Sequence, residues 1–133
     1  MTAQSLAEFA QNRGHEVAYL PLHSMASFSV EDAQGCHVVL SSAIHGTAEK
    51  ECLAHELGHC EYGGFYNRYS PYDIRAKAER RADKWAFSKL VPYGQIMAAI
   101  KQGITEVWEL AEYFDVSTEF MSKALAYYKT AIA

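Results

Sequence analysis

Polar and apolar positions in the first third of the chain predict one short helix followed by three strands. Ser5 and Glu8 have the spacing of a capping box, and Gly14 is suited to end the helix that they begin. Three later runs combine apolar, β-branched and aromatic residues, and a turn separates the last two, as in a hairpin. The expected strands are residues 17–22, 27–30 and 36–41.

After residue 41 the apolar positions follow a helical period. Serine or threonine caps, together with proline and glycine, divide this part of the chain into five helices. The expected starts are Thr47, Ser70, the residues just after Pro92, Thr105 and Ser117, and the helix that starts at Ser70 is expected to end at Val91.

This order of elements predicts an α+β fold, with a small antiparallel or mixed three-stranded sheet followed by a helical bundle. We expect one domain over residues 1–133, divided into a helix with the sheet (1–46), two central helices (47–91) and C-terminal helices (92–133). Hydrophobic residues make up 50% of the chain and charged residues 21%, which favours a compact core and excludes a disordered chain.

Charge and hydropathy count against binding of nucleic acid, secretion and membrane insertion. The formal net charge is −4, which counts against direct binding of nucleic acid, since such proteins usually carry a basic face. Residues 1–12 lack the basic start and apolar run of a signal peptide, and no apolar stretch reaches the roughly 18 residues that a membrane span needs. The sequence therefore predicts a soluble, cytoplasmic protein.

Three cysteines are present, Cys36, Cys52 and Cys60. An odd count in a chain of this size is untypical of a disulfide framework. Cys52 and Cys60 are separated by a helical rise of about 12 Å if they share a helix, which is too far for a bridge. Pairs of Cys36 with either of the others stay open, and we expect three reduced thiols.

The strongest chemical signal is the run His55-Glu56-Leu57-Gly58-His59. On a helix, residues four apart share a face, so both imidazoles can reach one metal ion. Glu56 borders the same face and is placed to take a proton from a metal-activated water. A helix that happens to carry two surface histidines is the plain alternative.

The next long helix offers a third ligand. Glu79 and Asp83 lie among apolar residues on one face of its helical wheel, whereas lysines and arginines occupy the other face. A buried carboxylate needs a partner, and a zinc ion and a ligating imidazole would supply one each. Ordinary ion pairs with Arg75 and Arg80 are the alternative.

Other candidates have weaker signals. Tyr66 and Tyr69, in a loop rich in aromatic residues, are candidates for stabilising an oxyanion or binding substrate. Cys52 lies one turn before His55 and is expected to pack under the metal site rather than bind the ion. The remaining histidines lack the spacing of ligands and are expected to be surface or packing residues; they are His15, His23, His37 and His45.

These motifs resemble the zincin peptidases in which a glutamate is the third zinc ligand, and more closely the ImmA/IrrE family of metallo-endopeptidases in its short phage and integrative-element form. The similar stretches are residues 53–60, 79–86, 90–92 and 109–117. The resemblance implies zinc bound by His55, His59 and Glu79. It also implies that Glu56 acts as general base and acid, and that Asp83 holds a ligating histidine.

The resemblance further implies site-specific cleavage of a protein substrate, a DNA-binding repressor of a phage or mobile element. The separate N-terminal helix-turn-helix domain of longer relatives has no counterpart here, so we expect no direct DNA binding by that route. Residues 36–41 are our candidate for the edge strand that aligns the substrate, since they immediately precede the metal-binding helix.

Two other functions stay open. Residues 105–129 form two short helices around 115–117, reminiscent of a helix-turn-helix, so the chain would be a DNA-binding or protein-docking regulator. Alternatively, the zinc is structural and the chain is a catalytically silent adaptor. That second reading needs a fourth protein ligand, for which Cys52 is the obvious choice.

Overall fold

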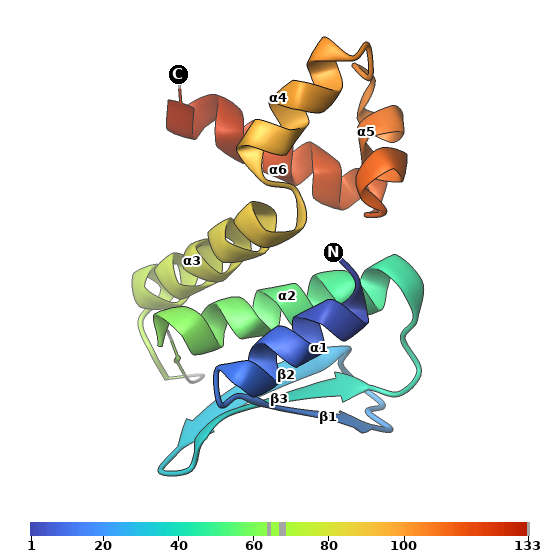
Figure 1. The fold of residues 1–133 in the computed structure, drawn as a ribbon. Helices are drawn as coiled ribbons and strands as arrows, with labels where there is room; N and C mark the ends of the chain where they lie inside the picture. Colours follow the sequence, from blue (N-terminus) through green and yellow to red (C-terminus); the bar gives the residue numbers. More distant parts are fainter. Residues whose placement is uncertain (64, 67–68, 133) are drawn as a thin grey trace.

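The computed structural model describes residues 1–63, 65–66 and 69–132 and confirms the α+β fold, with a small mixed sheet followed by a helical region (Figure 1). The elements are α1 (Ala3–Asn12), β1 (Glu16–Leu20), β2 (Ser27–Asp32), β3 (Gly35–Ser41), α2 (Gly46–Tyr62), α3 (Tyr72–Leu90), α4 (Tyr93–Lys101), α5 (Val107–Phe114) and α6 (Thr118–Ile132).

Four predicted helix caps are shifted by one to three residues, and one of them is Ser70, since Pro71 occupies the cap position of α3. The first helix is capped by Thr2, whose hydroxyl accepts from the Ser5 backbone N–H, so Ser5 is the reciprocal partner within the capping box and not its start. His45 and Glu106 occupy the cap positions of α2 and α5. The predicted Ser117 cap of α6 is confirmed by the 3.1 Å hydrogen bond that its hydroxyl accepts from the Phe120 N–H.

The sheet has the order β1-β3-β2, with β3 parallel to β1 and antiparallel to β2. The predicted hairpin is therefore confirmed, and so is the inward face of β3, since Cys36, Val38 and Leu40 are buried. The expectation that residues 36–41 form an edge strand is wrong. This strand is central because β1 returns alongside it, and β2 is the edge that lies next to α2.

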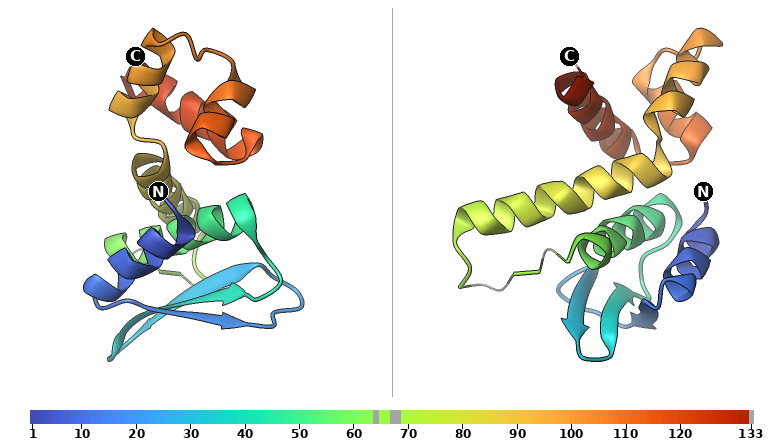
Figure 2. Two further views of the ribbon diagram at one scale, coloured as in Figure 1. Left: turned by 45° about the vertical axis from the view of Figure 1, so that its right-hand side comes forward. Right: turned by 60° about the vertical axis from the view of Figure 1, so that its left-hand side comes forward.

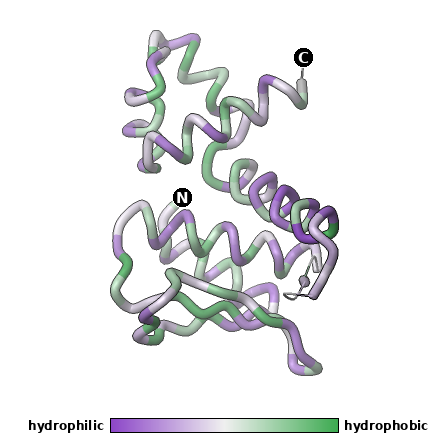
Figure 3. Tube along the Cα trace, turned by 180° about the vertical axis from the view of Figure 1, so that it is seen from behind, coloured by the Kyte–Doolittle hydropathy of each residue, from purple (hydrophilic) through white to green (hydrophobic). Residues whose placement is uncertain are grey.

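Helices α1 and α2 cover one face of the sheet (Figures 1 and 2). Leu6 of α1 and Leu53 and Leu57 of α2 are fully buried there with the inward residues of β3. Burial of one such side chain contributes about 1.5–3 kcal/mol, so this layer fixes the position of α2 on the sheet. Figure 3 shows the chain from behind, with α3 largely hydrophilic and the strands more hydrophobic. Helix α3 packs against α2.

The C-terminal helices pack through apolar residues and are tied to α2 by polar contacts. Leu110, Val116 and Met121 are buried within the core cluster. The Glu51 carboxylate accepts hydrogen bonds from the N–H and hydroxyl of Ser117, at 2.6 and 2.9 Å. The segment 105–129, which resembles a helix-turn-helix, therefore packs its apolar residues against the rest of the chain. None of the described helices is both long and apolar enough to cross a membrane.

The expectation of three reduced thiols is wrong for two of them. Cys36 of β3 and Cys60 of α2 form a disulfide, with their Cα atoms 5.7 Å apart, and Cys52 is a free thiol. The sequence left this pairing open. It forms because Cys36 faces inward from the sheet at the place where the last turn of α2 crosses it.

Helices α2 and α3 touch backbone to backbone at Gly58. A Cβ atom at this position would lie 2.6 Å from the carbonyl oxygen and 2.8 Å from the Cα of Ala82. Ala82 is fully buried and has no room to move aside. Glycine is therefore required for the two helices to lie this close.

We predict that Gly58→Ala lowers the free energy of unfolding by about 1–3 kcal/mol, because the added methyl group pushes the helices apart. Gly94→Ala is the matched control, since a Cβ at this helical glycine meets nothing within 4 Å. Chemical denaturation of both variants measures the difference. Equal stability of the two variants would contradict the close contact.

Candidate metal centre

Two helices place three ligand-type side chains at one point. Helix α2 contributes His55 and His59, one turn apart, and α3 contributes Glu79. The Nε2 atom of His55 lies 2.7 Å from Oε2 of Glu79, and Nε2 of His59 lies 3.2 Å from Oε1. One ligand atom from each of the three residues falls within 4.8 Å of the others. A single carboxylate thus faces both imidazoles.

The electrostatics of this group suit a cation. The hydrogen bonds from His55 and His59 outweigh burial and hold the pKa of Glu79 well below its usual range. Burial alone would lower the pKa of His55, but the carboxylates of Asp83 and Glu79 raise it to about 10. Two imidazoles and one carboxylate are ligands that zinc accepts at catalytic sites, with a further position left for water or substrate.

Asp83 holds His55 from behind. Its Oδ1 atom lies 2.9 Å from Nδ1 of His55, so the ring directs Nε2 towards Glu79. A carboxylate on the far nitrogen of an imidazole is the usual support of a metal ligand. Within the described residues, neither Glu79 nor Asp83 forms an ion pair with Arg75 or Arg80, which removes the alternative of ordinary helix pairs.

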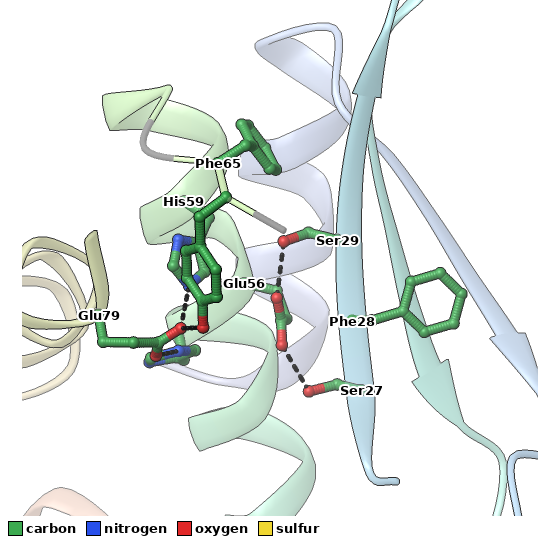
Figure 4. A pocket seen from close by; sticks show the side chains of 9 residues that line it. Ser27, Phe28, Ser29, Glu56, His59, Phe65 and Glu79 are labelled. Carbon is green, nitrogen blue, oxygen red and sulfur yellow. Dashed lines mark hydrogen bonds and ion pairs between the residues drawn. The ribbon is translucent and has the colours of Figure 1, made fainter. Parts of the chain in front are cut away.

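Glu56 points from the same helix towards the sheet. Its side chain is buried, with the residue 8% exposed, and its two carboxylate oxygens accept hydrogen bonds from Ser27 and Ser29 of β2, at 2.8 and 2.7 Å (Figure 4). These serines alternate with Phe28, which points to the other side of the strand. Neither serine was predicted from the sequence. Their two-residue spacing on a predicted strand was the only available signal, and it did not reveal which helix the strand faces.

A cavity of about 400 Å³ opens onto these groups. Glu56, the three ligand-type residues and Tyr66 all line it, together with Ser27, Phe28, Ser29 and Phe65. The Tyr66 hydroxyl donates to Glu79, and this bond is the main reason that the pKa of Tyr66 is raised to about 12. Tyr69 is 78% exposed and is not among the lining residues. The structure therefore brings one of the two candidate tyrosines to the site.

The remaining candidates lie outside the cluster. Cys52 does not belong to the group of His55, His59 and Glu79, and burial raises the pKa of its thiol. His37 pairs with Asp32 and Glu16 at the edge of the sheet, and His15 pairs with Glu61. In the described part of the chain, three residues of this group could hold a metal ion, the number of protein ligands typical of catalytic zinc.

The family model described as the IrrE N-terminal-like domain, Peptidase_M78, matches residues 10–126. The chain belongs to this family. The predicted resemblance to ImmA/IrrE proteins is thereby confirmed, and membership of a peptidase family supports a metallopeptidase-type function. A search of the curated proteins found no match.

For this member of the IrrE N-terminal-like family, we predict that Asp83→Ala weakens zinc binding by roughly 10–100-fold, because the ring of His55 loses the group that orients it. Asp73→Ala, an exposed carboxylate on the first turn of the same helix, should leave affinity unchanged. Competition with a chromophoric zinc chelator measures both. Wild-type affinity in Asp83→Ala would remove this residue from the site.

Proposed function

We propose that the chain is a zinc-dependent endopeptidase. The observation that carries this proposal is the convergence of His55, His59 and Glu79 on one point, with the carboxylate of Glu56 lining the same cavity. In this assignment the first three residues bind zinc, Glu56 is the general base and acid, and Asp83 positions His55.

Bound zinc would supply Lewis acidity, which activates water and polarises the peptide carbonyl. Glu56 would take the proton from the attacking water and pass it to the leaving amine. The hydroxyls of Ser27 and Ser29 hold both of its oxygens, so the carboxylate meets the substrate in one orientation. Tyr66 donates to Glu79 in the same cavity and is our candidate for stabilising the oxyanion.

Strand β2 is the better candidate for aligning the substrate. Within the sheet it pairs only with β3, and its residues 27–29 line the cavity beside Glu56. An extended peptide added to its open edge would bring a main-chain carbonyl past the metal centre. Side chains at alternate positions of this peptide would then decide which sequence is cut.

For the substrate we propose a DNA-binding repressor of a phage or mobile element, cut in the cytoplasm. The support is the resemblance to ImmA/IrrE proteins. The silent-adaptor function is disfavoured because Cys52 stands outside the ligand group. The docking-regulator function is disfavoured because Leu110, Val116 and Met121 of the C-terminal helices are buried in the core.

Glu56→Gln should abolish cleavage while zinc is retained, because the amide keeps the shape of the side chain but accepts no proton. The assay is co-expression with a DNA-binding repressor of a phage or mobile element, followed by mass spectrometry of the products. Glu49→Gln, on the same helix but outside the cavity lining, is the control. Wild-type cleavage by Glu56→Gln would refute the general-base role.

Replacing both Ser27 and Ser29 by alanine should lower kcat roughly 10-fold, a part of the 10²–10⁴-fold that a positioned general base contributes. KM and zinc content should stay close to wild type, since neither serine belongs to the ligand group. Ser88→Ala, on the exposed side of α3, controls for the loss of a hydroxyl. An unchanged kcat would show that the serine contacts do not position Glu56.

A further inference from the structure

A second cluster of metal-binding groups lies at the last turn of α2, next in sequence to the candidate centre. Cys60 follows His59 directly, Cys36 comes from β3, and His15 precedes β1. The two sulfur atoms and a ring nitrogen of His15 all lie within 4.8 Å of one another. We propose that Cys36, Cys60 and His15 bind a second zinc ion when the disulfide is reduced.

The chemistry of the three groups is that of a zinc site. Thiolate and imidazole are the ligands that zinc and related soft metals prefer, and Cys₂His sets with an added water occur in zinc proteins. Cys36 and Cys60 are 3% and 8% exposed, and the side chain of His15 is 13% exposed. A thiolate pair at this depth is shielded from bulk water, which strengthens its attraction for a cation.

The backbone fixes these ligands independently of the disulfide. The N–H of His15 donates to the carbonyl of Ala10 at 2.8 Å, which locks the residue against the end of α1. Cys36 is the second residue of the central strand β3, and Cys60 lies within the last turn of α2. Binding of zinc to both sulfurs at about 2.3 Å needs them to separate to roughly 3.8 Å, which side-chain rotation supplies while the Cα atoms stay in place.

A carboxylate supports His15 in the way that Asp83 supports His55. Oε2 of Glu61 lies 2.8 Å from Nε2 of His15, and Arg13 pairs with Oε1 of the same carboxylate at 3.2 Å. Because Glu61 is bonded to Nε2, the proposed site would use Nδ1 as the metal ligand. Carboxylate-backed imidazole is the common arrangement around protein-bound zinc.

Conversion of the disulfide form into the zinc-bound form conserves electrons and protons. Two thiols of a small reductant such as glutathione supply two electrons and two protons, the sulfur–sulfur bond of Cys36 and Cys60 breaks, and the reductant becomes a disulfide. Zinc then displaces the two thiol protons and forms two zinc–sulfur bonds. Disulfide and metal exclude each other, so the oxidised protein binds one ion fewer.

Cobalt(II) is the probe, because thiolate ligation gives it a near-ultraviolet charge-transfer band that histidine and carboxylate ligands do not give. Reduced full-length protein, titrated anaerobically, should bind two cobalt ions and show the band, whereas oxidised protein should bind one and lack it. Cys36→Ser and Cys60→Ser should each lose the band and one ion. Cys52→Ser, the matched control, should keep both.

Glu79→Ala separates this site from the proposed catalytic one. This variant should lose the ion bound at the candidate metal centre and keep the thiolate band of the second site. The comparison of reduced with oxidised wild type needs no substitution, so a misfolded variant cannot decide the test. A reduced wild-type protein without the band would overturn the second site, as would a band that persists in Cys36→Ser.

Discussion

The candidate centre depends on how closely α2 and α3 approach each other at Gly58. With backbone atoms of Ala82 filling the space where a Cβ would stand, the two helices lie near enough for one carboxylate to face two imidazoles. A larger residue at position 58 would move Glu79 away from His55 and His59. The glycine of the histidine-bearing motif is therefore a packing requirement of the candidate metal centre, in addition to the histidines on either side of it.

The sheet positions Glu56, the candidate general base of the site. Burial of Leu53 and Leu57 holds α2 on the sheet, and this contact brings Glu56 against the edge strand β2. The two serine hydroxyls then fix its carboxylate at the wall of the cavity. One helix thus directs His55 and His59 towards α3 and Glu56 towards β2. Its last turn directs Cys60 towards the start of the central strand β3.

Features that follow from the helical period were predictable from the sequence, and those that depend on strand order were not. His55, His59, Glu79 and Asp83 were found because residues three or four apart share a helical face. Spacing along one strand does not reveal its neighbours, and the position of β3 just before α2 does not show that β1 and β2 flank it. For the same reason, the serine contacts to Glu56 and the bridge from Cys36 to Cys60 appeared only in the structure.

The most direct test of the metal centre is the zinc content of the purified protein, measured by elemental analysis with the disulfide intact. Wild type is predicted to carry about one zinc per chain, and both His59→Ala and Glu79→Ala are predicted to lose it. Full zinc in Glu79→Ala would show that the third ligand is assigned wrongly. A wild-type protein that takes up no zinc even when it is supplied would contradict the proposed enzyme.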